Sequence, residues 1–129
     1  MKQSFQPGDR KVYEKVVDAS ETASFQQEDV HPVYATFALA RDAEWACRLF
    51  VHEMKESDEE GIGTMVSVHH HSPAKIGQKV RFEATVSSIE RNEIICTYRA
   101  YVDDHLIAEG EQGQKILKKE KLTQLFENL

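Results

Sequence analysis

Cysteine is scarce in this 129-residue sequence, and long apolar runs are missing. Its two cysteines, Cys47 and Cys96, form no Cys-x-x-Cys pair and are too few for a disulfide framework. Because both lie in apolar stretches, we expect reduced thiols in the core. No stretch approaches the roughly 20 apolar residues of a membrane span, and the first residues have no apolar signal core. We therefore expect a cytoplasmic protein that enters no membrane.

Positive charge is also in deficit. Lysine and arginine number 16 against 22 aspartates and glutamates, which gives a formal net charge of -6. This balance argues against general affinity for nucleic acid or anionic membranes. The sequence contains no nucleophile elbow and no phosphate loop, and Gly61-Ile62-Gly63 lacks the third glycine of a dinucleotide fingerprint. The chemistry must therefore come from other residues.

Hydrophobic periodicity predicts one domain over residues 1–129, with residues 1–10 as a loose lead-in. Leu39, Ala43, Ala46 and Phe50 recur at spacings of three and four within residues 36–54, the period of a helix face. Residues 20–33 suggest a loop or short helical turns, as a flap over a pocket. A short terminal helix is expected after the last strand. Strands are predicted at residues 11–19, 62–71, 79–89, 93–102 and 105–118.

Short turns at Arg91-Asn92 and Asp103-Asp104 connect the later strands, so these strands should be antiparallel. One long apolar helix on one face of an antiparallel sheet is an α+β architecture. A five-stranded antiparallel sheet wrapped around one central helix is the hotdog fold, and this is the fold we expect.

Glu44 is the first candidate for chemistry, because it lies midway along the most apolar helix. We expect its side chain to point inward or towards an interface, where burial would raise the pKa of the carboxyl and suit it to general base catalysis. The alternative is a partly exposed glutamate paired with Arg41 or Arg48.

Three consecutive histidines, 69–71, fall on a predicted strand, where side chains alternate between faces. We place His70 inward and His69 and His71 outward. A metal site on His69 and His71 lacks further ligands, so no metal is expected.

Thr36 begins the predicted helix, either as its N-cap or as a hydroxyl placed where the helix dipole favours an anion. Gly63 could allow a ligand to approach closely. Tyr34, like Trp45, is expected more often in a core or interface than against a ligand.

Several motifs follow one another at set spacings. They are Tyr34-Ala35-Thr36-Phe37, Glu44 eight residues after the threonine, Gly61-Ile62-Gly63-Thr64, His70 seven residues after Gly63, Ser72-Pro73, Ile76-Gly77-Gln78-Lys79-Val80 and Ile107-Ala108-Glu109-Gly110. Together they resemble the fluoroacetyl-CoA thioesterase-like branch of the hotdog superfamily, over roughly residues 12–120.

This resemblance implies a thioesterase that hydrolyses a small acyl-CoA-type thioester at a dimer interface, with coenzyme A entering only as part of the substrate. It implies that Thr36, Glu44 and His70 are catalytic, the glutamate attacking the acyl carbonyl or activating water. Gly63, Tyr34 and Phe37 are the expected substrate-binding residues. A homodimer or a dimer of dimers also agrees with the open edge strands of such a sheet.

The last strand departs from this pattern. Many relatives carry Gly-x-His-x-Arg, whereas Gly110 is followed here by Gln112 and Gln114. Loss of the arginine removes a candidate contact to the coenzyme phosphates, and nothing assigns fluoroacetyl specificity. A non-catalytic acyl- or small-ligand-binding hotdog protein is the alternative. A hydratase or dehydratase on the same fold is a third reading, but the sequence shows no motif for it.

Overall fold

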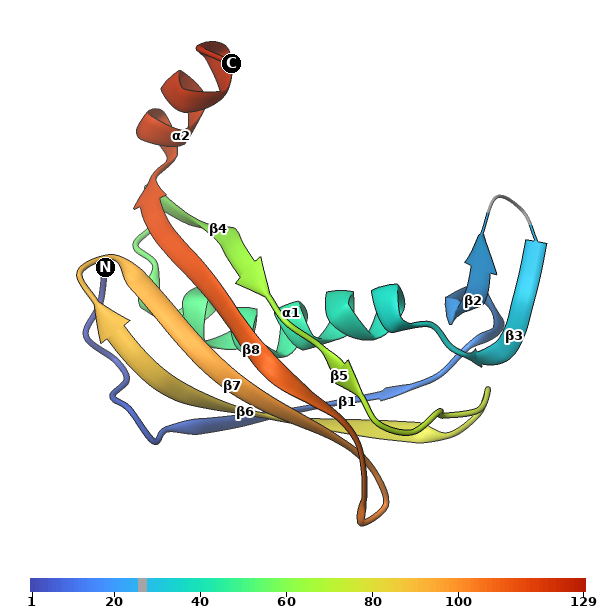
Figure 1. Cartoon of the computed structure of the whole chain (residues 1–129). Coiled ribbons are helices and arrows are strands. Elements are labelled where there is room, and N and C mark those ends of the chain that lie inside the picture. The colour runs from blue at the N-terminus through green and yellow to red at the C-terminus, as the bar shows by residue number, and fades with distance from the viewer. Residues whose placement is uncertain (26–27) are drawn as a thin grey trace.

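A curled antiparallel sheet surrounds one long helix (Figure 1). The computed structural model describes residues 1–25 and 28–129. The main sheet has the strand order β1-β6-β7-β8-β4, and the short strand β5 also pairs with β8. The elements in chain order are β1 (Arg10–Val16), the 3-10 turn η1 (Ala19–Glu21), β2 (Thr22–Phe25), β3 (Glu28–Tyr34), α1 (Thr36–Met54), β4 (Glu59–Val66), β5 (His69–His70), β6 (Lys79–Glu90), β7 (Glu93–Val102), β8 (His105–Lys118) and α2 (Lys119–Glu127).

This arrangement confirms the predicted hotdog fold, with α1 at the predicted residues. The region expected to be a loop or helical turns is instead the turn η1 followed by a β2–β3 hairpin, apart from residues 26 and 27, which lie outside the described residues. In Figure 1 this hairpin lies at the beginning of α1, and α2 projects from the opposite end of the molecule. The hairpin and the start of α1 together form the region where the candidate site lies.

The core lies between α1 and the inner face of the sheet. Leu39, Ala43 and Phe50 are fully buried, as the helical period predicts. Cys47 and Cys96 are both free and buried. The first nine residues have no helix or strand, and within them the Phe5 ring contacts Phe50 edge-on at 5.0 Å between centroids.

The strand predicted at residues 62–71 is divided into β4 and β5, with Ser67 between them. Here Ser67 N–H donates to the Glu111 carbonyl at 2.9 Å, and the Tyr98 hydroxyl donates to the Ser67 carbonyl at 2.7 Å. Gly110 makes this approach feasible, since a Cβ there would collide with the Ser67 carbonyl oxygen. The division redirects the chain so that His70 reaches the beginning of α1.

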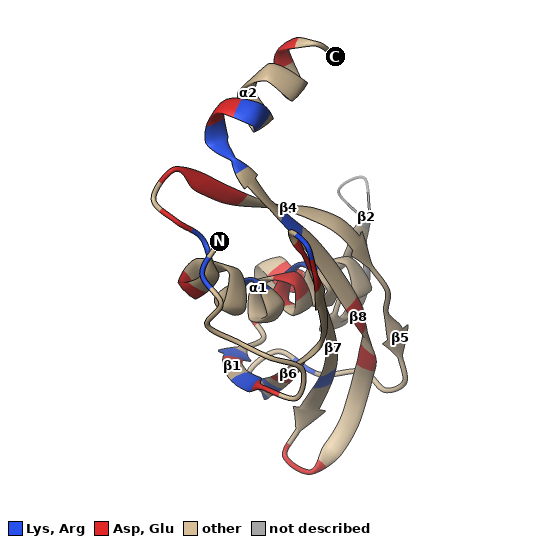
Figure 2. Cartoon of the chain, turned by 90° about the vertical axis from the view of Figure 1, so that its left-hand side faces the viewer, with Lys and Arg blue, Asp and Glu red and all other residues tan. Residues whose placement is uncertain are grey.

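Charge is distributed unevenly over the surface (Figure 2). Acidic residues gather at the beginning of β4 and at the β7–β8 turn, while both signs occur together on β1 and β6. In the part of the chain that the structure describes, no helix is long and apolar enough to cross a membrane.

Replacing Gly110 by alanine should lower the free energy of unfolding by about 1–3 kcal/mol, because the new methyl group cannot fit beside Ser67. Urea denaturation followed by circular dichroism measures this loss. Glu111→Ala on the same strand is the matched control, since its side chain is exposed, and should change stability by less than about 0.5 kcal/mol. Equal denaturation midpoints for Gly110→Ala and wild type would contradict the close approach.

Candidate active site

Thr36 and His70 meet at the beginning of α1, although 34 residues separate them in the chain. Thr36 Oγ1 lies 3.0 Å from His70 Nδ1. The N-cap prediction for Thr36 is wrong: Ala35 is the N-cap, it makes no side-chain cap hydrogen bond, and Thr36 is the first helical residue. The Thr36 hydroxyl therefore interacts with the histidine and lies where the positive end of the helix dipole acts.

His70 points towards the helix, as predicted, while its two neighbours lie on the other side of the strand. Its Nε2 is buried and makes no hydrogen bond to any residue that the structure describes. Burial lowers the pKa of His70 below its ordinary value near 6.5, and the neighbouring His71 lowers it further, against an opposing hydrogen bond at Ser72. A neutral imidazole with one unpartnered nitrogen can accept a proton or a hydrogen bond from a ligand.

A pocket of about 290 Å³ opens beside this pair, between the β2–β3 hairpin and the segment after β5. Its lining residues are Ala23, His31, Val33, Tyr34, Ala35, Thr36, His70, His71, Ser72 and Pro73. Tyr34 therefore lies where a substrate contact is predicted, and it is itself almost fully buried. Phe37 lies on the exposed side of the first turn of α1. The pocket is large enough for a small acyl group.

Glu44 lies two turns further along α1. It is exposed in the single chain, so the expected inward position is wrong, and a position at an interface stays a prediction. None of the ion pairs in the described part of the chain joins it to Arg41 or Arg48. Its Oε1 instead accepts a hydrogen bond of 3.1 Å from Gln112 Nε2.

Gly63 lies directly behind this carboxylate. A Cβ at Gly63 would lie 2.6 Å from Glu44 Oε1, closer than real side chains approach. The absence of a side chain at Gly63 therefore makes room for the Glu44 carboxylate; no unusual backbone conformation requires a glycine here. Gly63 thus lies against Glu44 and not against the pocket beside Thr36, and its predicted contact with a substrate stays a prediction.

The single chain does not bring the three predicted catalytic residues together. Eight residues of helix separate Thr36 from Glu44, which corresponds to a rise of about 12 Å. Thr36 and His70 form one half of the arrangement, and Glu44 with Gly63 forms the other.

Buried charges that the sequence interpretation missed surround the beginning of α1. Asp42 and Glu21 are both buried; Lys15 and Arg41 each form ion pairs with both of them, and the Tyr34 hydroxyl donates to Asp42. Burial and the hydrogen bond to Asp42 raise the pKa of the Tyr34 hydroxyl well above its ordinary value. A signal was available, since Asp42 falls on the apolar face of the helix, where a carboxylate needs partners.

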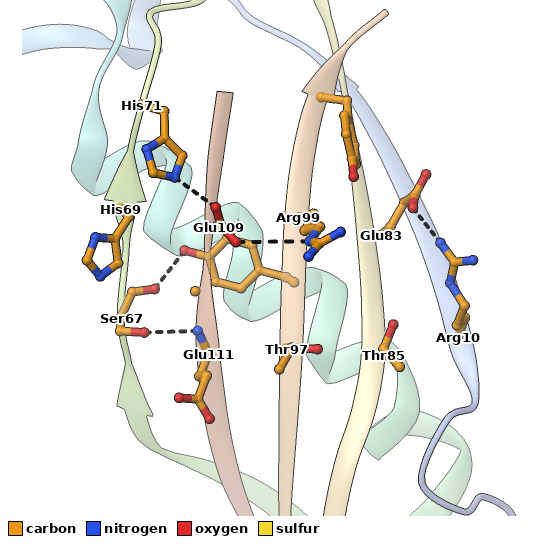
Figure 3. Close-up of a pocket in the computed structure, with 13 residues that line it drawn as sticks. Arg10, Ser67, His69, His71, Glu83, Thr85, Thr97, Arg99, Glu109 and Glu111 are labelled. Atoms are coloured by element: carbon orange, nitrogen blue, oxygen red, sulfur yellow. Dashed lines mark hydrogen bonds and ion pairs between the residues drawn. The ribbon is translucent and has the colours of Figure 1, made fainter. Parts of the chain in front are cut away.

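A second and larger hollow, of about 880 Å³, lies on the sheet face away from α1 (Figure 3). His69 and His71 lie here with their rings stacked, and His71 Nε2 lies 2.9 Å from Glu109 Oε2. Among the described residues, no group of three or more metal-binding side chains gathers, so these two histidines gain no third ligand. Charged groups in this hollow pair with one another, as Arg10 does with Glu83. The pair of Thr36 and His70 is therefore the better candidate for chemistry.

A family model described as "Fluoroacetyl-CoA-specific thioesterase" matches residues 17–120 of this chain. The chain belongs to the fluoroacetyl-CoA-specific thioesterase family. The predicted resemblance is thereby confirmed.

Solved structures share the fold of this chain. A hypothetical protein of Thermus thermophilus, described as a thioesterase superfamily member, is 34% identical, with a TM-score of 0.93 over 98% of this chain and 93% of its own. The fluoroacetyl-CoA thioesterase FlK is 22% identical, with a TM-score of 0.89 over 98% of each chain. A hot-dog-like protein from Thermanaerovibrio acidaminovorans is 20% identical, with a TM-score of 0.86 over 97% of this chain and 93% of its own. No curated protein sequence matches the chain.

The imidazole of His70 should titrate below pH 6.5, because its surroundings disfavour the charged form. Because the pKa of this imidazole is lower in the folded state, the unfolded chain binds the proton at a higher pH than the folded chain does. His70 should therefore reduce stability as the pH falls from about 7 through its folded pKa, and not above pH 7. NMR titration of the histidine ring protons, assigned by the signal lost in His70→Gln, measures this directly. A His70 midpoint at or above 6.5 would refute the prediction.

Proposed function

We propose that this chain is a thioester hydrolase that acts on a small acyl-CoA-type thioester, with Thr36, Glu44 and His70 as its catalytic residues. The observation that carries the proposal is the contact between Thr36 Oγ1 and His70 Nδ1 at the mouth of a small pocket, in a chain of a thioesterase family. FlK has been solved with fluoroacetate and coenzyme A, and in one variant with acetyl-CoA. A short acyl group is thus the class of substrate we infer, without specificity for fluorine.

Each group has a chemical role in this proposal. Glu44 takes a proton from a water that attacks the acyl carbonyl carbon, or attacks that carbon itself and forms a mixed anhydride that a water then hydrolyses. In either case the carbon–sulfur bond breaks, the departing thiolate takes up a proton and leaves as the coenzyme A thiol, and the acyl group leaves as the carboxylic acid. The Thr36 hydroxyl at the start of the helix orients the thioester where the helix dipole favours the negative charge that develops on the carbonyl oxygen. His70, neutral near pH 7, holds that hydroxyl and accepts or returns a proton.

A second copy of the chain would bring a Glu44 carboxylate close to Thr36 and His70. Within one chain Glu44 lies about 12 Å along the helix from Thr36, too far for both to contact one carbonyl. Exposed apolar side chains on α1 and on the edge strand β4 support a homodimer: Phe37 and Trp45 are 53% and 41% exposed, and Met65 and Val66 lie on β4. Glu44 of one protomer would then act with Thr36 and His70 of its partner.

A non-catalytic ligand-binding protein is the second candidate. It is favoured by the glutamines at positions 112 and 114, which replace groups that can carry charge. Such a protein would keep the pocket and the fold but would release no thiol.

Thiol release from a panel of short-chain, branched and aryl acyl-CoAs separates these two functions. Wild type should turn over at least one of them, and Glu44→Ala should lower kcat by about 100-fold or more, because the base or nucleophile is lost. The circular dichroism spectrum of the variant should be unchanged, since Glu44 is exposed. Binding of an acyl-CoA without turnover, equally strong in wild type and Glu44→Ala, would favour the ligand-binding protein.

A heterodimer experiment tests whether two protomers share each site. Differently tagged Thr36→Val and Glu44→Ala chains, co-expressed and purified as a heterodimer, should recover about half of the wild-type kcat, because one of two sites is complete. The matched control pairs a wild-type chain with a Thr36→Val/Glu44→Ala chain. This control should be nearly inactive if the sites are shared, and half active if each chain works alone. The reverse pattern, or a monomer in light scattering, would overturn the shared site.

A further inference from the structure

We propose that Gln112 is a positioning residue for Glu44, and that Gln114 and Arg48 orient its amide. The inference rests on the role proposed above for Glu44 in thioester hydrolysis. It assigns a purpose to the two positions where the last strand departs from its relatives.

Three side chains form a continuous series of hydrogen bonds that ends at the Glu44 carboxylate; we call Arg48, Gln114 and Gln112 the amide relay. Arg48 Nη1 donates to Gln114 Oε1 over a long 3.4 Å, and Gln114 Nε2 donates to Gln112 Oε1 at 3.0 Å. Gln112 Nε2 then donates to Glu44 Oε1 at 3.1 Å. The relay therefore begins at Arg48 on α1, passes through two residues of β8 and returns to Glu44 on α1.

The direction of the relay follows from the chemistry of its first member. A guanidinium can only donate, so Gln114 must present its oxygen to Arg48 and its nitrogen to Gln112. Gln112 must in turn present its oxygen to Gln114 and its nitrogen to Glu44. Its second N–H donates to the Gly113 carbonyl at 3.0 Å, so a reversed amide would set oxygen against oxygen at two places. The donor facing Glu44 is thereby determined.

Glu44 is held at one oxygen only. Its Oε1 lies between Gln112 and the space left by Gly63. Within the described residues, Oε2 makes no hydrogen bond or ion pair. The relay thus fixes the rotamer of an otherwise exposed side chain and leaves one oxygen to face a carbonyl carbon or a water. Fixing that rotamer lowers the entropy cost of bringing the carboxylate into a reactive geometry.

Both glutamines are 1% exposed, so their amides have protein partners and cannot exchange them readily for water. The Gln114 side chain points into the protein, towards Arg48 and Gln112. Arg48 of α1 supplies the guanidinium at this point, held in place by the Gly61 carbonyl at 3.2 Å and by Glu60 at 2.6 Å.

Variants of the relay test this role through the division between kcat and KM. Gln112→Leu keeps the volume but removes the donor, and should lower kcat by about 10- to 100-fold with KM changed less than about 3-fold. Gln112→His restores an N–H donor and should recover most of that loss. Gln114→Leu should lower kcat less, by about 3- to 10-fold, because Gln112 keeps its bond to Gly113. Ile116→Val, a mild core change on the same strand, is the control and should stay within about 2-fold of wild type.

A crystal structure of Gln112→Leu, beside that of wild type, gives a readout that does not need turnover. The Glu44 carboxylate should leave the space at Gly63 in this variant and stay there in Ile116→Val. Displacement of Glu44 in a protein that hydrolyses no thioester would support the positioning role and reject the proposed function. If Glu44 keeps its rotamer in Gln112→Leu, or if kcat is unchanged in both Leu variants of an active enzyme, the positioning role is wrong. Should Gln112→Leu fail to fold, the same measurements on Gln114→Leu decide the question.

Discussion

The packing of α1 inside the curled sheet is the constraint on which the rest of the molecule depends. Its buried face, built on Leu39, Ala43 and Phe50, allows only one rotation of the helix about its axis. That rotation places Glu44 and Trp45 on the exposed side and Thr36 at the helix terminus next to β5. The candidate catalytic groups therefore take their positions from the mainly apolar packing of the buried face of the same helix.

Ion pairs and hydrogen bonds then fix the side chains that this packing brings close together. At the start of α1, Asp42 and Glu21 share Lys15 and Arg41, so the turn before the hairpin, the first strand and the helix are connected. Removing one partner of such a buried group would leave a charge unpaired, which costs far more than an exposed pair contributes. In the middle of α1, the buried Gln112 donates to the Glu44 carboxylate, and the buried Gln114 donates to Gln112. Each half of the candidate site thus has a polar network of its own.

The sequence predicted some of these features better than others. The helix boundaries and the alternation of His69, His70 and His71 followed from periodicity, because side-chain direction in a regular element depends on local geometry alone. The division of the strand predicted at residues 62–71 into β4 and β5 did not follow from periodicity, since it depends on Tyr98 and Gly110 from two other strands. The contact of Glu44 with Gln112 was likewise missed, because the sequence of one helix cannot show which strand residues lie beside it.

By itself, the sequence determined the fold class, the long central helix and the resemblance of spacing among Thr36, Gly63 and His70, since periodicity and spacing are written along the chain. Only the tertiary structure decided which of these residues touch. Thr36 contacts His70, while Gly63 makes room for Glu44, and the two halves lie about 12 Å apart along the helix. The reason is physical: a contact between distant residues depends on strand register and helix rotation, and both are set by the packing of the whole core.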